Sequence, residues 1–291
     1  MDAFYTSPQV AQELWEILCN FLNVKEENYF FLEPSAGDGV FSTLPTHCDA
    51  YDIEPHAENI QTADFLTLTP KRNDYITIGN PPFGKRSALA IEFFNHAVPY
   101  SDVIAMIFPR QFQKWLTQKQ LDSSFKLVYD KPLGTDTFIY EGKRPVGGIR
   151  CTFQIWIKEN SRFDVFPNFR ILSAPPTSLP GEIDLWQHNG TEQSKATVEK
   201  PWEYATYRQG YKDYKKLFTH EKDYQFIKKQ IETTSDQFFF MKPLTPVARE
   251  IILHLDFQKL ANKNTTVKGF GKADFCEFYL RIKQQLERRR K

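Results

Sequence analysis

With 291 residues, 15% of them aromatic, the chain is long enough for one ordinary domain and a smaller second one. The formal net charge of +1 argues neither for nor against a nucleic-acid partner. Four cysteines without a CxxC pair and six scattered histidines argue against a disulfide framework and a zinc site. We find no signal peptide and no apolar run that could span a bilayer, so the sequence predicts a reduced, cytoplasmic protein with no membrane partner.

Charge is distributed unevenly along the chain. Residues 1–200 carry 18 Lys and Arg against 25 Asp and Glu, whereas residues 201–291 carry 19 against 11. A polyanion, if one is bound, would therefore be held by the C-terminal part. A solvated basic surface has the same composition and stays an alternative.

The chain begins with a predicted helix. Ser7 followed by Pro8 is typical of a helix N-cap with proline at the first helical position. The N-terminus of such a helix is a natural place for a carboxylate. One face of this helix would carry the apolar residues Val10, Leu14, Ile17, Leu18 and Phe21.

A glycine turn comes next. A short apolar strand over residues 29–32 leads into the sequence Glu33-Pro34-Ser35-Ala36-Gly37-Asp38-Gly39. Small residues and two glycines after a first strand let the backbone pass close to a ligand and then start a helix, which predicts a nucleoside site. The pattern is not GxGxxG, so a dinucleotide site loses its main support. A simple acidic glycine turn is the structural alternative.

Carboxylates follow at two further strand ends. Asp52, Ile53 and Glu54 lie about twenty residues beyond the first turn, where such folds usually hold ribose hydroxyls. Asp64 and Phe65 come after a second short segment. Taken singly, each acid could be a solvated strand end; the ordered set favours a ligand site.

The tetrapeptide Asn80-Pro81-Pro82-Phe83 follows an apolar run over residues 75–79. Adjacent prolines cannot continue a sheet ladder, so a buried strand should end at Asn80, and ligands bind at such strand ends in open α/β sheets. The side-chain oxygen of Asn80 and a neighbouring backbone oxygen can accept both N–H bonds of one exocyclic amino group, leaving its lone pair to attack an electrophilic methyl. Phe83 offers a flat face for a ring. A plain Asn-Pro-Pro turn is the alternative.

The following segments alternate between helix and strand. We predict a helix over residues 87–97, a buried strand over 103–108, a helix over 111–119 and a strand over 125–129. This alternation is typical of a doubly wound α/β sheet.

These motifs together resemble the S-adenosylmethionine-dependent amino methyltransferases that make N6-methyladenine, whose catalytic motif has an NPPF form. The resemblance covers residues 4 to about 158, and the motif order is similar to that of the gamma class. It implies a Rossmann-like methyltransferase sheet that ends in an antiparallel hairpin formed by residues 137–140 and 151–158. The expected catalytic core spans residues 1–160.

The resemblance also implies the site residues. Glu33 would lie toward the cofactor's amino group, Asp52 on the ribose and Asp64 on the adenine amino group. The cofactor-binding residues would be Tyr5, Thr6, Pro8, Glu33, Pro34, Ala36, Gly37, Asp38, Asp52, Ile53, Asp64, Phe65 and Asn80. The catalytic residues would be Asn80, Pro81, Pro82, Phe83 and Phe138, with Phe138 stacking on the target base opposite Phe83. A core or loop aromatic is the alternative for Phe138.

The resemblance does not extend beyond about residue 158, so the expectations for the remaining chain come from its residue types and their pattern. Residues 161–201 are expected to form a linker or surface loop, since they are rich in Pro, Ser, Thr and Gly toward their end. Residues 202–291 are expected to form a smaller α+β region that recognises the target or serves as an accessory. Within it, residues 202–216 interleave aromatics with cations, which suits either bases and phosphates or a half-buried strand pair.

Two further patterns stand out in this region. Phe238, Phe239 and Phe240 are predicted to be core. Residues 273–291 form a predicted amphipathic helix with a basic end, and its inward residues would be Phe275, Phe278, Tyr279, Ile282 and Leu286.

The implied activity is site-specific methyl transfer from S-adenosylmethionine to N6 of adenine, in DNA rather than RNA, with the base flipped out of the duplex. RNA, a cytosine or a glutamine amide offers a similar planar amine. Phe83 favours nucleic acid, because glutamine-directed relatives commonly carry tyrosine after the prolines. A catalytically silent module that only binds nucleic acid is the alternative of a different class.

Overall fold

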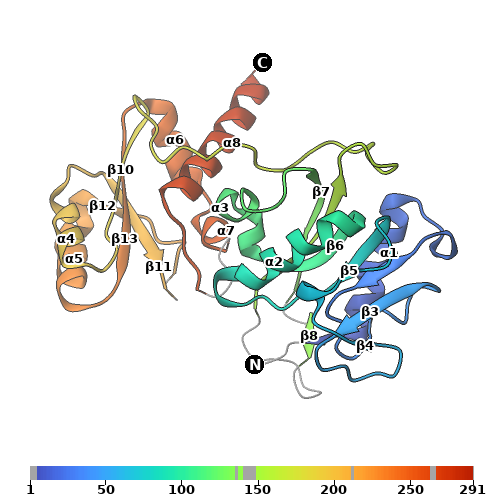
Figure 1. Ribbon diagram of the computed structural model, residues 1–291. Helices are drawn as coiled ribbons and strands as arrows, with labels where there is room; N and C mark the ends of the chain where they lie inside the picture. The colour runs from blue at the N-terminus through green and yellow to red at the C-terminus, as the bar shows by residue number, and fades with distance from the viewer. Residues whose placement is uncertain (1–4, 135–136, 140–148, 211–212, 263–266, 291) are drawn as a thin grey trace. The chain divides into compact units, whose positions relative to one another are not determined.

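The computed structural model describes residues 5–134, 137–139, 149–210, 213–262 and 267–290, and it divides into two compact units, Met1–Leu172 and Ser173–Lys291. Each unit has its own sheet (Figure 1). Each also has its own hydrophobic core. Residue 4, Tyr140, residues 211–212 and Lys291, which belong to predicted motifs, lie outside the described residues.

The first unit is built on a seven-stranded sheet. In sheet order its strands are β4 (Gln61–Thr62), β3 (Cys48–Asp52), β2 (Phe31–Glu33), β5 (Tyr75–Gly79), β6 (Ser101–Pro109), β9 (Cys151–Lys158) and β7 (Phe125–Pro132). The first five run parallel, and β9 lies antiparallel between β6 and β7. The chain moves outward from β2 to β4 and then returns to β5 beside β2, so the order reverses between β2 and β5. The predicted doubly wound α/β sheet is confirmed, and its reversal point is where open sheets bind ligands.

The antiparallel hairpin differs from the predicted one. Strand β9 pairs with β7 and β6, whereas β8 (Phe138–Ile139) pairs with β1 (Tyr5–Thr6) in a separate two-stranded ribbon. The expectation that residues 137–140 pair with residues 151–158 was therefore wrong. Because β9 is hydrogen-bonded along both edges, it offers no edge to another strand.

Both faces of the first sheet are covered by apolar clusters. Along β6, Val103, Ala105 and Ile107 join the cluster of α1 (Pro8–Leu22), and the alternate residues join the cluster of α2 (Ala88–Ala97). The other helical segments of this unit are α3 (Trp115–Gln118), η1 (Glu26–Asn28), η2 (Phe65–Thr67), η3 (Lys85–Ser87), η4 (Val98–Tyr100) and η5 (Arg110–Gln113). Strands buried on both faces explain why β5 and β6 read as continuous apolar runs.

Helix α1 starts where the sequence predicts. The Ser7 hydroxyl accepts the Val10 N–H at 3.3 Å, and Pro8 is the first helical residue. The predicted helix over residues 111–119 is instead the short turn η5 followed by α3.

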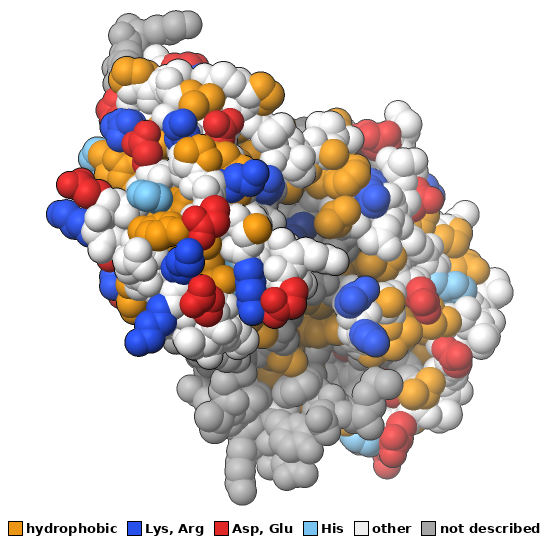
Figure 2. Space-filling model, turned by 90° about the vertical axis from the view of Figure 1, so that its left-hand side faces the viewer, with side chains coloured by type: hydrophobic (Ala, Val, Ile, Leu, Met, Phe, Trp, Pro, Cys, Tyr) orange, Lys and Arg blue, Asp and Glu red, His pale blue; other side chains and the backbone are white. Residues whose placement is uncertain are grey.

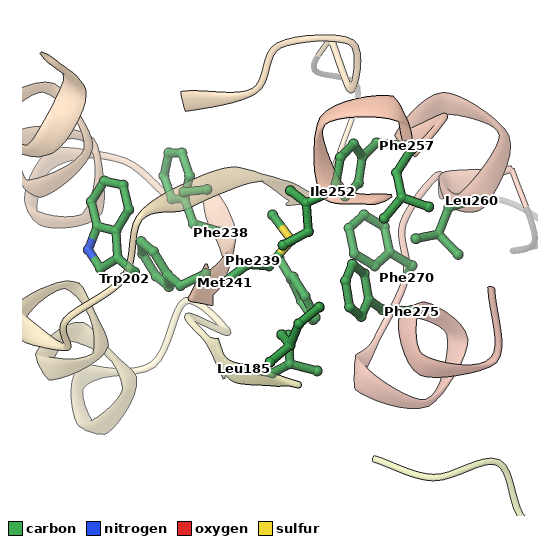
Figure 3. Packing of buried hydrophobic residues seen from close by; sticks show 14 of the residues in the cluster. Leu185, Trp202, Phe238, Phe239, Met241, Ile252, Phe257, Leu260, Phe270 and Phe275 are labelled. Carbon is green, nitrogen blue, oxygen red and sulfur yellow. The ribbon is translucent and has the colours of Figure 1, made fainter. Parts of the chain in front are cut away.

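The second unit carries a four-stranded antiparallel sheet with the order β10 (Ile183–Gln187), β13 (Gln237–Pro243), β11 (Tyr204–Gln209) and β12 (Phe218–Thr219). Its helical segments are α4 (Glu192–Lys195), η6 (Ala196–Glu199), α5 (His220–Thr233), α6 (Pro246–His254), α7 (Phe257–Ala261) and α8 (Lys272–Arg290). Figure 3 shows the aromatic packing between β13 and the helices, where Phe238 and Phe239 are fully buried as predicted. The predicted α+β character of this region is confirmed.

One expectation for the second unit needs correction, and one choice between two alternatives is decided. Part of the segment expected to be a linker is the strand β10, because Ile183 and Leu185 are buried against β13. In the segment 202–216, Trp202, Tyr207 and Tyr214 are buried in the core, so these aromatics belong to a half-buried strand and its flanks rather than to a base-stacking surface.

Helix α8 buries Phe275, Phe278 and Tyr279, and the partly buried Ile282 and Leu286 pack on the same core, as the periodicity predicted. Within the described ranges, no helix is both long enough and apolar enough to cross a membrane.

We expect Phe94→Ala to destabilise the first unit by about 3–5 kcal/mol, because its fully buried ring contacts Phe108, Phe125 and Trp156 and its removal leaves a cavity. Urea denaturation, with hydrogen exchange of the β6 amides to assign the transition, measures the loss. The control Leu116→Ala, at a side chain exposed in α3, should stay within about 0.5 kcal/mol. Equal losses in both variants would contradict this packing.

Candidate active site

Three parallel strands, β2, β3 and β5, end at the same edge of the first sheet. Strand β5 ends at Gly79, as the two prolines predict, and the Ser35 hydroxyl donates a hydrogen bond to the backbone oxygen of Asn80 at 3.1 Å. A Cβ atom at Gly79 would lie 3.5 Å from Cγ of Glu33. The glycine turn and the Asn-Pro-Pro-Phe segment, far apart in sequence, therefore lie side by side.

The glycine turn is tied to the end of β3. Gly37 has a φ of +49°, and its N–H donates to Oδ2 of Asp52 at 2.8 Å. The other carboxylate oxygen of Asp52 accepts the Glu54 N–H at 2.9 Å. Because each carboxylate oxygen has a second lone pair, Asp52 can orient this corner and still accept hydrogen bonds from a hydroxyl-bearing ligand.

Glu33 is a buried carboxyl group at the end of β2. It is 1% exposed, and its Oε2 has no hydrogen-bond partner among the described residues. Burial raises the pKa of Glu33 well above its ordinary value, although hydrogen bonds from Ser42 oppose this effect. An unsatisfied buried carboxyl oxygen is suited to a ligand with a cationic donor, such as an ammonium group.

Tyr5 lies over the glycine turn. A Cβ atom at Gly37 would be 2.9 Å from Cε1 of Tyr5, so only glycine leaves room for this ring. The Tyr5 hydroxyl is 3.3 Å from Nδ1 of His56, and that nitrogen is 3.0 Å from Oδ1 of Asp38. Burial and, next, the charge of Asp38 raise the pKa of Tyr5, so its hydroxyl keeps its proton. The ring thus forms one wall of the turn.

His56 is a site residue that the sequence analysis missed. Its backbone N–H donates to the Gly37 oxygen at 3.0 Å, and its ring joins Tyr5 to Asp38. Since a carboxylate only accepts hydrogen bonds, Nδ1 must carry a hydrogen when it bonds Asp38. No spacing rule identifies a lone histidine, and its nearness to the segment ending at Pro55 was the one available signal.

The residues expected around an adenine ring have different environments. Ile53 is 73% exposed, so its apolar side chain is open to a ligand. Asp64 is exposed, but its Oδ1 accepts the Leu66 N–H at 3.0 Å and starts η2. Phe65 is 1% exposed and packs against Phe93 and His96 in the α2 cluster. The structure therefore gives Phe65 a core position, where it cannot offer a free ring face.

The two phenylalanines expected to hold the target base are in contact. The ring centroids of Phe83 and Phe138 are 6.4 Å apart, with an interplanar angle of 72°. Phe138 is 2% exposed, and its strand register with Thr6 brings the start of the chain to this position. An edge-to-face pair has no parallel-walled slot for a third ring. Stacking on both faces of a base would require Phe138 to move.

The remaining predicted residues lie at the same edge. Pro34, Ala36 and Pro81 are buried, Asn80 and Pro82 are half-buried, and the side-chain oxygen of Asn80 is shielded from solvent. Thr6 is buried and Pro8 begins α1. No group of three His, Cys, Asp or Glu residues in the described ranges could hold a metal ion.

Surface hollows are found elsewhere in the chain. One of about 480 Å³ is lined by residues 243–254 at α6, and another of about 230 Å³ by residues of α4, η6 and α5. Neither is lined by residues of the strand edge in the first unit, so the candidate site rests on the arrangement of its polar groups.

Comparison with solved structures finds similar chains. A candidate RNA methyltransferase from Pyrococcus horikoshii has a TM-score of 0.42 at 18% identity, over 53% of this chain and 87% of its own. The modification subunit of a candidate type I restriction enzyme from Vibrio vulnificus has a TM-score of 0.41 at 13% identity, over 54% of this chain and 44% of its own. The 23S rRNA methyltransferase ErmE has a TM-score of 0.39 at 15% identity, over 55% of this chain and 71% of its own.

No protein-family model matches the sequence, and no curated protein matches it.

We expect Glu33→Gln to flatten the pH dependence of stability. The pKa of Glu33 is raised on folding, so the folded state holds this proton after the unfolded chain has lost it. The proton held by Glu33 therefore makes the free energy of unfolding fall as the pH rises above about 4.5, near the ordinary pKa of a glutamate. Free energies of unfolding between about pH 5 and pH 8 should fall more for the wild type than for the variant. Parallel curves would contradict the raised pKa.

Proposed function

We propose that this chain is a site-specific DNA methyltransferase, which transfers a methyl group from S-adenosylmethionine to the exocyclic N6 of adenine. The observation that supports it is the meeting of the glycine turn, Asp52 and the Asn80-Pro81-Pro82-Phe83 segment at one sheet edge, joined by hydrogen bonds from Gly37 and Ser35. This edge lies at the reversal point of the sheet.

The residues at this edge fit the proposed cofactor. The unsatisfied oxygen of Glu33 would accept its ammonium group, Asp52 would accept its ribose hydroxyls, and the exposed Ile53 would pack on its adenine ring. Tyr5 and the N-terminus of α1 would enclose its carboxylate end. The cofactor supplies an electrophilic methyl group on a positively charged sulfur.

The chain's own part in the reaction is to hold and orient the amine. The backbone oxygen of Asn80 accepts the Ser35 hydroxyl, and the second acceptor beside the Asn80 side-chain oxygen would be the carbonyl of the next residue, Pro81. These two oxygens would accept both N–H bonds of N6 and draw its lone pair out of the ring. A bond from N6 to the methyl carbon then forms as the carbon–sulfur bond breaks. No strong base is required, because the methylated amine is acidic and loses a proton afterwards.

The target adenine would have to leave a duplex to reach Asn80. Phe83 is half-buried and would stack on one face of the base. Phe138 would stack on the other face only after turning from its edge-to-face contact with Phe83. Binding of the base would therefore be coupled to movement of the β1–β8 ribbon, which carries Phe138.

One experiment tests the proposed activity directly. The protein is incubated with cofactor labelled in the methyl group and with DNA, RNA and protein acceptors, and the labelled acceptor is digested to nucleosides. We expect the label in N6-methyl-2′-deoxyadenosine, the methylated nucleoside released from DNA. Label in RNA alone would revise the acceptor, and label in no acceptor despite cofactor binding would favour a silent binding module.

We expect Asn80→Ala to lower methyl transfer by at least about 100-fold, because an acceptor for the reacting amine is lost. The Kd of the cofactor, measured by calorimetry, should change little. Asn20→Ala, at an exposed position of α1, is the matched control and should retain activity. Full activity of the Asn80 variant at saturating cofactor would contradict the catalytic role.

We expect Asp52→Asn to raise the Kd of the cofactor by about tenfold or more, since a hydrogen bond to a charged group contributes about 1.5–3 kcal/mol. Transfer at saturating cofactor should fall much less. The control is Glu58→Gln, an exposed carboxylate in the loop after β3. An unchanged Kd for the Asp52 variant would remove this residue from the cofactor site.

A further inference from the structure

We propose that Lys85 and Arg86 bind the backbone phosphates next to the target nucleotide and so hold the strand at Phe83. This inference rests on the proposed function, because it assumes that the ring on Phe83 is a base of a nucleic acid. It adds a phosphate-binding element that lies in the first unit, whereas the charge distribution of the sequence pointed to the C-terminal part.

The two cations lie in a turn with an unusual backbone. Gly84 has a φ of +66°, Arg86 of +56° and Ser87 of +66°. Left-handed conformations are costly for residues other than glycine, and they persist only where the surroundings impose them. A functional constraint is one reason for a protein to keep such a turn.

Neighbouring residues hold this turn in place. The Ser87 side chain is 3% exposed, and its hydroxyl donates to Oε1 of Gln111 at 3.2 Å. A Cβ atom at Gly84 would lie 2.8 Å from Cβ of Leu89, so the turn packs directly on the start of α2. The backbone that carries the two cations is therefore anchored on both sides, while their side chains are exposed.

The two cations also differ from three basic residues of the first unit that lie beside carboxylates. Lys71, Arg72 and Arg162 lie 3.9, 2.8 and 3.5 Å from a carboxylate oxygen. Neither Lys85 nor Arg86 has an ion pair or a side-chain hydrogen bond within the described part of the chain. Residues 1–172 contain 16 Lys and Arg against 21 Asp and Glu, and the side chains of Lys85 and Arg86 stay open to an anion within the described part of the chain.

Their position suits a phosphate beside the stacked base. Consecutive Cα atoms are 3.8 Å apart, so the Cα of Lys85 lies within about 8 Å of the Cα of Phe83. An extended lysine or arginine side chain covers a comparable distance. Lysine acts on phosphate as a point charge, and arginine can donate two parallel hydrogen bonds. Together they would bind the sugar–phosphate backbone without reading sequence.

The test compares Lys85→Gln/Arg86→Gln with the wild type. Binding to a fluorescent adenine-containing duplex is measured by anisotropy between about 50 and 200 mM salt, with S-adenosylhomocysteine present. Each lost phosphate contact lowers the slope of log K against log salt by about 0.9 in duplex DNA, so the double variant should lose between about 1 and 2. Its affinity at low salt should fall at least about tenfold, with an unchanged Kd for S-adenosylhomocysteine.

Two further variants serve as controls. Lys25→Gln/Lys119→Gln removes the same charge from two exposed lysines of the first unit and should leave the slope unchanged. Lys85→Arg/Arg86→Lys keeps both charges and should retain the wild-type slope. This result would show that the double glutamine variant loses slope through lost charge and not through a misfolded turn.

The outcomes distinguish this inference from the proposed function. If the wild type methylates DNA and the Lys85/Arg86 double variant keeps the wild-type slope of log K against log salt, the phosphate contact is overturned and the proposed activity stands. A wild type that transfers no methyl, but whose DNA binding loses slope in the double variant, would support the contact and overturn the activity. A wild type that binds no nucleic acid would overturn the contact.

Discussion

Two hydrogen bonds bring the candidate site together. The N–H of Gly37 bonds the carboxylate of Asp52, and the hydroxyl of Ser35 bonds the carbonyl of Asn80. The first joins the turn after β2 to the end of β3, and the second joins the same turn to the end of β5. Backbone bonds from Ala36 to Tyr51 and from His56 to Gly37 add to the first connection, so the three strand ends share a defined geometry. The turn after β2 is therefore the part on which the rest of the site depends.

The same edge concentrates groups that are costly to a folded chain. Glu33 is a buried carboxyl with an unsatisfied oxygen, and the turn after Phe83 keeps non-glycine residues in left-handed conformations. Such features lower the free energy of unfolding unless a bound ligand offsets their cost. Their occurrence beside the glycine turn is the physical reason for interpreting this edge as a binding site rather than as a solvated sheet end.

The second unit contributes less to the argument than its composition suggested. Its buried aromatic residues, among them Phe238, Phe239 and Phe270, fill the space between β13 and the helices, so these rings are unavailable for stacking on bases. Its cations are mixed with acids: Lys228 pairs with Glu199, and Arg249 with Glu203. Figure 2 likewise shows basic and acidic side chains interspersed on the face that it presents. Much of the aromatic and basic content of the second unit is therefore explained by its buried core and its charged, solvent-exposed surface.

Local constraints were readable from the sequence. Two prolines end β5 at Gly79, Ser7 and Pro8 start α1, and glycines permit the turn after β2, because each effect depends on the backbone preferences of a few adjacent residues. The alternation of strands and helices likewise predicted the doubly wound sheet. These features depend on residue type and on local spacing along the chain.

Contacts between distant segments were decided by the tertiary structure alone. It pairs β8 with β1 instead of β9, buries Phe65, turns Phe138 edge-on to Phe83, and brings His56 to Tyr5. Each outcome depends on which edge or surface remains uncovered once the sheet has formed. Residue type and local spacing do not show which distant segment will cover a given edge. The sequence therefore determined where the backbone of the site turns, and only the tertiary structure decided which side chains surround the site.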